Sequence, residues 1–342
     1  MVVGYFVNFR VLRLNYILAV SLTAILGTAI TGHAQTQALH LASTAWSPFT
    51  NSPGKARYAL ELVHTALERL GIHADTTIIE ESRLTSSLLE EAFDGSAALW
   101  RDEVRQRALF FSQPYLQNRL VLVGRRGSDV SATTLAKLAG QRLALVEGYS
   151  YGDTPSAPNG PTYVPSRSEE DSLRKVLEGT ADYTLMDELV MEYLLKNYSE
   201  EARSRLAFGS EPLIIRTLHL AIRRTLPDAQ QIIDRFNAEL LKMVEDKSYN
   251  RLLQLDWLLA DVDGDGTPEY VPRDDQIGPN VPDRGYKLFT DRGTSDSPQK
   301  PHFYLGGKVY PSWSAVPDGY KANRAPGTFT EGTQIRLFSF TF

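Results

Sequence analysis

Apolar residues along the chain follow two alternating patterns, short continuous runs and stretches with helical spacing. Continuous runs predict strands at residues 38–43, 74–79, 97–100, 116–124, 142–146, 183–185 and 213–223. Helical spacing predicts helices at residues 54–71, 84–93, 133–138, 168–177, 188–196 and 228–245. Strands separated by helices are typical of parallel α/β sheets, so the pattern predicts an α/β fold.

Two segments of the chain share a sequence motif, which indicates two lobes of similar construction. Residues 89–98 and 173–182 each combine a helical pattern, a glycine and a short apolar run. The pattern predicts that the two helices end at Gly95 and Gly179 and lead into buried strands.

The first residues resemble a secretory signal peptide. Arg10 and Arg13 precede an apolar run at residues 16–30, and small residues follow at the −3 and −1 positions of a cleavage point between Ala34 and Gln35. A membrane anchor is the alternative, but the run is short and polar residues interrupt it. We therefore expect cleavage, export and a periplasmic mature protein.

Composition excludes several kinds of site. A net charge of −5 argues against a nucleic-acid-binding surface. The absence of cysteine excludes disulfides, zinc–thiolate sites and cysteine nucleophiles. The six histidines show no metal-ligand spacing. We expect no cofactor in the two lobes.

The order of elements predicts four regions. These are a signal peptide at 1–34, lobe 1 at 35–118 and 218–258, lobe 2 at 119–217, and a C-terminal extension at 259–342. The strands at 116–124 and 213–223 would cross between the lobes as hinges. The extension is rich in Gly, Pro, Asp and aromatic residues, which predicts strands and loops, including a hairpin around Gly306 and Gly307 and a strand at 334–342.

A family resemblance enters at residues 105–115, Arg-Gln-Arg-Ala-Leu-Phe-Phe-Ser-Gln-Pro-Tyr. This segment resembles the arginine-to-"FS-x-PY" stretch of family 3 extracellular solute-binding proteins, the periplasmic receptors for polar amino acids that serve ABC importers. Segments 45–49, 138–148 and 181–187 are similar to other family motifs, in the family's order. The resemblance covers residues 37–258 and implies a two-lobed, type II periplasmic-binding-protein-like fold, a monomer and a small polar ligand.

Carried over by position, the resemblance implies that Arg105 binds a ligand carboxylate and that Asp187 binds its ammonium group. A guanidinium offers paired donors that match a carboxylate. The alternative for Arg105 is an ion pair within the protein. For Asp187 the alternative is a helix N-cap, because it follows a strand and precedes a helix.

Five further residues complete the candidate ligand site. Trp46 matches an aromatic lid over the ligand, or else it packs in the core. Trp100 stands where the family usually has glycine or a small hydroxyl residue, so it would narrow the pocket or stack on a ring; Asp102 follows closely. Tyr149 and Ser150 lie in the lobe 2 loop, where backbone N–H groups would add carboxylate donors.

The implied mechanism is closure of two lobes around the ligand, which shifts an open–closed equilibrium. Delivery to an ABC permease is the first interpretation. A receptor that signals through its extension, to a membrane sensor for example, is the second. A dehydratase or lyase on this fold, with Asp102 as general acid, is the third.

An acidic loop in the extension has the spacing of a calcium ligand set. Carboxylates and a backbone carbonyl would come from Asp261, Asp263, Asp265, Thr267 and Glu269. Pro272 occupies the position of the bidentate Glu of an EF-hand, so the loop resembles shorter nine-residue calcium loops. A solvated acidic turn is the alternative, since Asp and Gly favour turns.

Overall fold

The computed structural model describes Met1 and residues 38–154, 158–197, 199–282, 285–287 and 302–322. The predicted signal peptide, apart from Met1, and the strand predicted at 334–342 lie outside these residues. None of the described helices has the length and apolar character of a membrane span.

Most strands of the described chain form one large mixed sheet, in the order β2-β1-β3-β9-β5-β8-β6-β7, with β4 also paired to β9. The strands are β1 (Ala38–Thr44), β2 (His73–Ile79), β3 (Gly95–Trp100), β4 (Leu109–Phe111), β5 (Leu116–Arg125), β6 (Arg142–Val146), β7 (Thr162–Ser166), β8 (Tyr183–Asp187) and β9 (Leu206–Arg223). Strands β1, β2 and β3 are parallel, as are β6, β7 and β8. The predicted parallel α/β organisation is confirmed.

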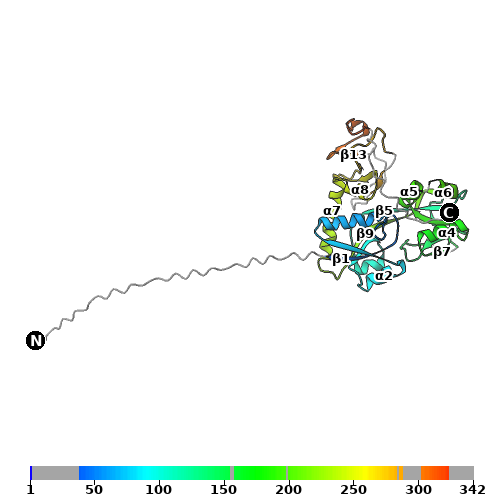
Figure 1. Cartoon of the computed structure of the whole chain (residues 1–342), viewed down its shortest axis with the longest axis horizontal. Helices are drawn as coiled ribbons and strands as arrows, with labels where there is room; N and C mark the ends of the chain where they lie inside the picture. Colours follow the sequence, from blue (N-terminus) through cyan, green and yellow to red (C-terminus); the bar gives the residue numbers. More distant parts are fainter. Residues whose placement is uncertain (2–37, 155–157, 198, 283–284, 288–301, 323–342) are drawn as a thin grey trace. The chain divides into compact units, whose positions relative to one another are not determined.

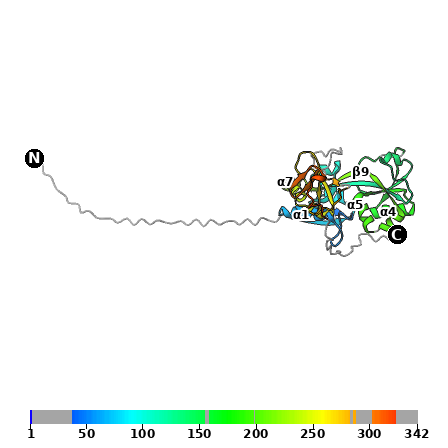
Figure 2. The ribbon, with the colours of Figure 1, turned by 90° about the horizontal axis from the view of Figure 1, so that it is seen from above.

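Strands β5 and β9 join two groups of strands. We call β1–β4 with their helices lobe 1, and β6–β8 with theirs lobe 2. The two joining strands pair antiparallel from Leu116 opposite Leu218 to Arg125 opposite Leu206. Figure 2 shows β9 leading from the part that carries α1 and α7 to the part that carries α4 and α5. The two predicted hinge strands are therefore confirmed.

Strand β9 begins earlier than the apolar run at 213–223 predicts, because its first half contains residues that break such runs. Pro212 lies opposite Val121, where the register with β5 shifts. At Gly209 a Cβ atom would lie 2.9 Å from the Val130 carbonyl oxygen, so glycine permits the close approach of another segment.

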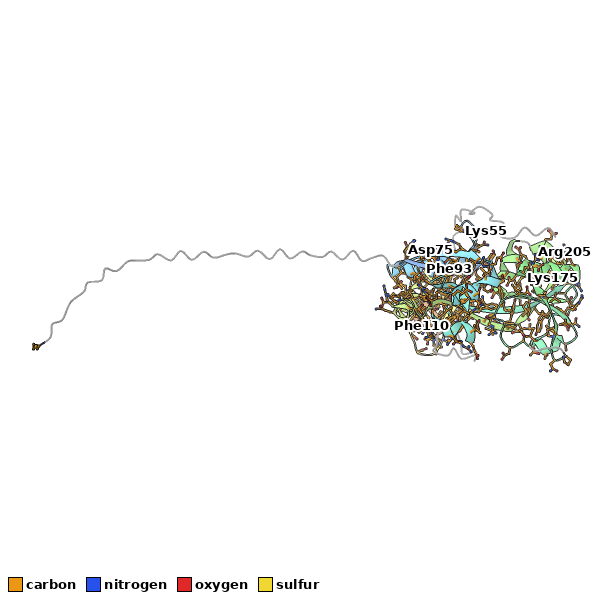
Figure 3. The ribbon with its side chains drawn as sticks, turned by 90° about the horizontal axis from the view of Figure 1, so that it is seen from below. Lys55, Asp75, Phe93, Phe110, Lys175 and Arg205 are labelled. Atoms are coloured by element: carbon orange, nitrogen blue, oxygen red, sulfur yellow. The ribbon has the colours of Figure 1, made fainter. Side chains whose placement is uncertain are left out.

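Helices cover both lobes. They are α1 (Tyr58–Arg69), α2 (Glu81–Leu89), α3 (Glu103–Ala108), α4 (Glu169–Glu178), α5 (Glu188–Asn197), α6 (Ser199–Arg205), α7 (Ala229–Glu245) and α8 (Ser248–Leu252), with 3₁₀ turns at Leu135–Leu138 and Trp313–Ala315. Helix α1 packs against β2 and β3 in lobe 1. Helix α7 lies beside β9 in lobe 1, and α4 lies beside β7 in lobe 2 (Figure 1). Labelled side chains mark the lobes in Figure 3, with Phe93 and Phe110 on lobe 1 and Lys175 on lobe 2.

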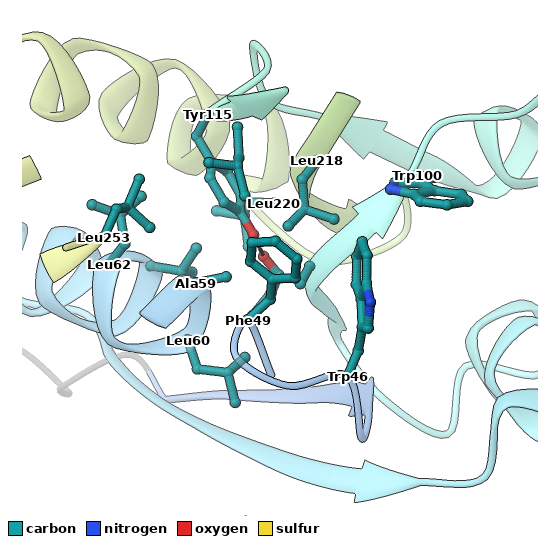
Figure 4. Close-up of a cluster of buried hydrophobic side chains, with 14 of the residues drawn as sticks. Trp46, Phe49, Ala59, Leu60, Leu62, Trp100, Tyr115, Leu218, Leu220 and Leu253 are labelled. Carbon is teal, nitrogen blue, oxygen red and sulfur yellow. Dashed lines mark hydrogen bonds between the residues drawn. The ribbon is translucent and has the colours of Figure 1, made fainter. Parts of the chain in front are cut away.

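The core of lobe 1 lies between its sheet and helices α1 and α7. Helix α1 buries the apolar face that its sequence spacing predicts, including Leu62, Val63 and Leu67. Tyr115 is fully buried beside this core, and its hydroxyl donates a 2.8 Å hydrogen bond to the Ala97 carbonyl (Figure 4). A buried tyrosine hydroxyl with a backbone partner stabilises the junction between β3 and the start of β5.

The prediction from the shared sequence motif is confirmed for one helix and wrong for the other. Helix α4 ends at Gly179, which has a φ of 79°, as predicted. Helix α2, however, ends at Leu89 instead of continuing to Gly95, and Gly95 is the first residue of β3. A Cβ atom at Gly95 would lie 2.0 Å from the Ala221 carbonyl oxygen on β9. Glycine is therefore required there for close strand packing and not as a helix end.

The extension contains a second sheet, in the order β12-β10-β11-β13-β14. Its strands are β10 (Trp257–Ala260), β11 (Glu269–Pro272), β12 (Tyr286–Lys287), β13 (His302–Leu305) and β14 (Lys308–Tyr310). The predicted hairpin is confirmed, since Gly306 and Gly307 join β13 to β14 with φ values of 56° and 76°. Asn250 of α8 donates a 2.9 Å hydrogen bond to the Val271 carbonyl, which fastens this sheet to lobe 1.

Candidate functional site

Both lobes line a small pocket at the carboxyl ends of β1, β3 and β6. Lobe 1 contributes Trp46, Trp100 and Arg105 among others, and lobe 2 contributes Tyr149 and Ser150. Ligands of α/β proteins commonly bind at this edge of a sheet. The cavity volume is about 30 Å³, which suits a water or two and is far below the 300 Å³ or more of typical ligand pockets.

Arg105 is held firmly beside the pocket. Its side chain is 4% exposed, and it donates hydrogen bonds to Thr85 Oγ1 from Nε (3.1 Å) and Nη2 (2.9 Å) and to the Trp100 carbonyl from Nη1 (3.1 Å). These bonds engage three of the five N–H groups of the guanidinium. Burial lowers the pKa of Arg105, while Asp102 and Glu81 oppose this shift. The side chain is therefore a preorganised cation at the pocket wall.

Asp102 links the arginine to the opposite lobe. Its Oδ1 accepts the backbone N–H of Arg105 at 2.8 Å, which caps helix α3. Its Oδ2 lies 3.2 Å from Arg105 Nε and accepts a 2.6 Å hydrogen bond from the Ser150 hydroxyl of lobe 2. Asp102 and Ser150 thus form a direct hydrogen bond between the lobes.

Four aromatic rings occupy the space between the lobes. Trp46 and Trp100 come from lobe 1, and their ring centroids lie 5.5 Å apart (Figure 4). Tyr149 of lobe 2 lies 5.8 Å from Trp46 and 5.3 Å from Trp100, and Tyr151 lies 5.8 Å from Trp100. These edge-to-face contacts stabilise the contact between the two lobes. The rings fill most of the space, which explains why the cavity is small.

Glu169 is a site residue that sequence reasoning missed. It is the first residue of α4 in lobe 2, and its Oε1 accepts a 2.8 Å hydrogen bond from the indole Nε1 of Trp46 in lobe 1. Burial raises the pKa of Glu169 to about 8, and the nearby carboxylate of Asp187 adds to the rise. In sequence this glutamate looks like an ordinary acidic first turn after the N-cap Ser168, so only the fold reveals its contact with the other lobe.

Asp187 is not among the residues that line the pocket. It is fully buried at the end of β8, where Oδ1 accepts the Leu189 N–H (2.8 Å) and Oδ2 accepts from Asn118 Nδ2 (3.0 Å). Asn118 Oδ1 in turn accepts from Trp100 Nε1 at 2.8 Å. Burial raises the pKa of Asp187 to about 7. The bond to Leu189 matches the N-cap alternative, and ligand binding by Asp187 stays a prediction.

The free energy of unfolding of the ligand-free protein is expected to fall as pH rises from about 5 to 8. Glu169 and Asp187 have native pKa values of about 8 and 7, above their ordinary values of 4.5 and 3.8. Across this window the unfolded chain therefore releases protons that the native protein retains, and the native state loses stability. Glu169→Gln removes one such group, so urea unfolding at several pH values should show a shallower fall.

Glu178→Gln is the matched control, because Glu178 is an exposed carboxylate on the same helix. It should keep the wild-type pH dependence. A Glu169→Gln protein with the wild-type slope would contradict the buried, protonated state of Glu169.

Comparison with known families identifies relatives of the two lobes. The family model for "Bacterial extracellular solute-binding proteins, family 3" matches residues 44–259 and confirms the resemblance seen in the sequence. No curated protein matches the chain.

Solved structures share the fold at low sequence identity. A mutant of ArgBP from T. maritima has 21% identity and a TM-score of 0.53, over 64% of this chain and 93% of its own. The GluR0 ligand-binding core from Nostoc punctiforme, in complex with L-glutamate, has 17% identity and a TM-score of 0.52, over 63% and 96%. The amino acid ABC transporter substrate-binding protein AbpA from Streptococcus pneumoniae, bound to L-arginine, has 15% identity and a TM-score of 0.52, over 64% and 93%.

Proposed function

The chain belongs to the bacterial extracellular solute-binding proteins of family 3, and we propose that it clamps a small amino-acid-like solute that carries an extra cationic group. The observation that carries this proposal is a pocket lined from both lobes with the buried guanidinium of Arg105 at its wall. Arg105 would bind the ligand carboxylate through a pair of charge-assisted hydrogen bonds.

The balance of charge around the pocket favours a cationic ligand. Four carboxylates gather where the lobes meet, from Glu81, Asp102, Glu169 and Asp187. The guanidinium group of Arg105 forms an ion pair with Asp102, and that of Arg216 interacts electrostatically with the same carboxylate. The described groups that shift the pKa of Glu169 and of Asp187 include no cation. A ligand ammonium or guanidinium beside Glu169 would lower the raised pKa of this group and pair with the carboxylate that results.

The aromatic rings suit the same ligand. Trp46, Trp100 and Tyr149 line the pocket, and the faces of such rings attract cations once water is excluded. To admit a ligand larger than the present cavity, the lobes would separate and break the Trp46–Glu169 and Ser150–Asp102 bonds. The ligand would then replace the indole N–H at Glu169 with its own cationic group, and closure would restore contact between the lobes.

The proposed role is capture and delivery, without chemical conversion of the ligand. We propose that the protein acts in the periplasm and passes its ligand to an ABC-type importer. Family membership supports an extracellular binding protein, and the name of AbpA, an amino acid ABC transporter substrate-binding protein, supports the importer.

A thermal-shift panel tests this proposal. L-arginine and L-lysine are each expected to raise Tm by about 5 °C or more at saturating concentration, because a ligand at 100 times its Kd stabilises by about 2.7 kcal/mol. L-glutamate should have little effect, and putrescine, which lacks the carboxylate, should have less effect than lysine. A larger shift with glutamate than with arginine would contradict the charge argument. No shift with any amino acid would contradict the ligand class.

A further inference from the structure

The acidic loop of the extension joins two paired strands. Residues 261–268 connect β10 to β11, and the register places Ala260 opposite Glu269. Ala260 and Glu269 therefore form the base of a hairpin loop, and Asp261 is the first residue of that loop. The loop lies in the second sheet, apart from the residues that line the ligand pocket.

Three carboxylates of the loop lie close together. One oxygen from each of Asp261, Asp263 and Asp265 lies within 4.8 Å of the others. Two oxygens bound to one Ca²⁺ at about 2.4 Å cannot lie more than about 4.8 Å apart, so this spacing fits a shared cation. Asp261 is buried, and its oxygens accept the N–H groups of Gly264 (2.7 Å) and Gly266 (3.1 Å), which wraps the loop around it.

A second observation, at Glu269, also indicates a bound cation. Its side chain is fully buried, and Oε2 accepts a 2.8 Å hydrogen bond from the N–H of Val262 within the loop. Its other oxygen, Oε1, is buried and has no hydrogen-bond partner among the described residues. A buried carboxylate oxygen without a partner is destabilising. A cation held against the loop would satisfy it.

We propose that the extension binds one Ca²⁺ through Asp261, Asp263, Asp265 and Glu269, with the Thr267 carbonyl as a further ligand. All these donors are oxygens, which selects hard cations. Ca²⁺ accepts six to eight oxygens in irregular geometry, whereas Mg²⁺ requires a near-ideal octahedron and retains waters. A loop with several protein oxygens close together suits the larger ion. Binding would hold β10 and β11 together at the end that the loop joins.

Calorimetric titration of the chelator-treated full-length chain with CaCl₂ tests the site, together with Tm measured in about 1 mM CaCl₂ or MgCl₂. We expect Ca²⁺ binding with one site per chain and a rise in Tm that Mg²⁺ does not reproduce. Asp263→Asn is expected to weaken Ca²⁺ binding about tenfold or more without loss of folding, because Asp263 is exposed. Glu269→Gln should also weaken it.

Asp318→Asn is the matched control, since it removes one exposed carboxylate elsewhere in the extension. It should leave the Ca²⁺ affinity unchanged. Failure of the chelated wild-type chain to bind Ca²⁺ would overturn the proposal, and so would equal weakening by Asp318→Asn or a preference for Mg²⁺. Because the measured quantity is metal affinity, the result does not depend on the identity of the solute.

Discussion

Arg105→Ala is expected to abolish the Tm increase produced by the amino acid that stabilises the wild-type protein most. The proposed ligand carboxylate would lose two charge-assisted hydrogen bonds worth about 1.5–3 kcal/mol each, which corresponds to a loss of affinity of at least about 100-fold. Arg105→Lys keeps the charge but loses the planar pair of donors, so it should retain only part of the affinity. Titration calorimetry with that amino acid measures both effects.

Two features make this experiment interpretable. Arg105 also bonds Thr85 and the Trp100 carbonyl, so we expect the alanine variant to be less stable without ligand, and binding should be measured well below its Tm. Arg142→Ala is the control, because Arg142 is an exposed residue of lobe 2 that pairs with Asp182 and does not line the pocket. A folded Arg105→Ala protein that binds with wild-type affinity would refute the assigned role.

Gly95→Ala is expected to lower the free energy of unfolding by about 3 kcal/mol and Tm by about 6 to 12 °C. The added methyl group would lie 2.0 Å from the Ala221 carbonyl oxygen, and that oxygen belongs to the backbone of β9, which cannot rotate away. Strands β3 and β9 would have to separate locally, which disturbs their pairing between Gly95 and Ile222. Thermal and urea unfolding measure the change.

Gly319→Ala provides the comparison. A Cβ atom at Gly319 meets no atom within 4 Å, so the substitution should change stability by no more than about 0.5 kcal/mol. If Gly95→Ala were as stable as Gly319→Ala, steric exclusion at the β3–β9 contact would be the wrong explanation for this glycine.

Local patterns predicted most elements, because their signals are contained in a few neighbouring residues. The helix at 54–71 appears as α1, and the strand at 142–146 appears as β6 with the same bounds. Where long-range contacts decide, the pattern failed. Gly95 looks like a helix end in sequence, yet its role depends on Ala221, which is far along the chain.

The candidate site divides in the same way. Arg105, Trp46 and Trp100 could be singled out because family motifs mark their positions, and the structure places all three on the pocket wall. Glu169 and Thr85 could not, because their importance lies in bonds to Trp46 and Arg105, which come from other elements. No spacing rule links an acidic first turn to a tryptophan in the opposite lobe.

The path of β9 through the large sheet has a consequence for the order of folding. The strands of lobe 2 are nearly contiguous in the chain, from Arg142 to Asp187, so their partners meet at a small cost in loop-closure entropy. In lobe 1, β3 pairs with β9, which comes more than 100 residues later in the chain. Helix α7, which packs against β9, ends only at Glu245. We therefore expect lobe 2 to acquire protected amides first during refolding, while lobe 1 stays exposed to proteases until its last strand arrives.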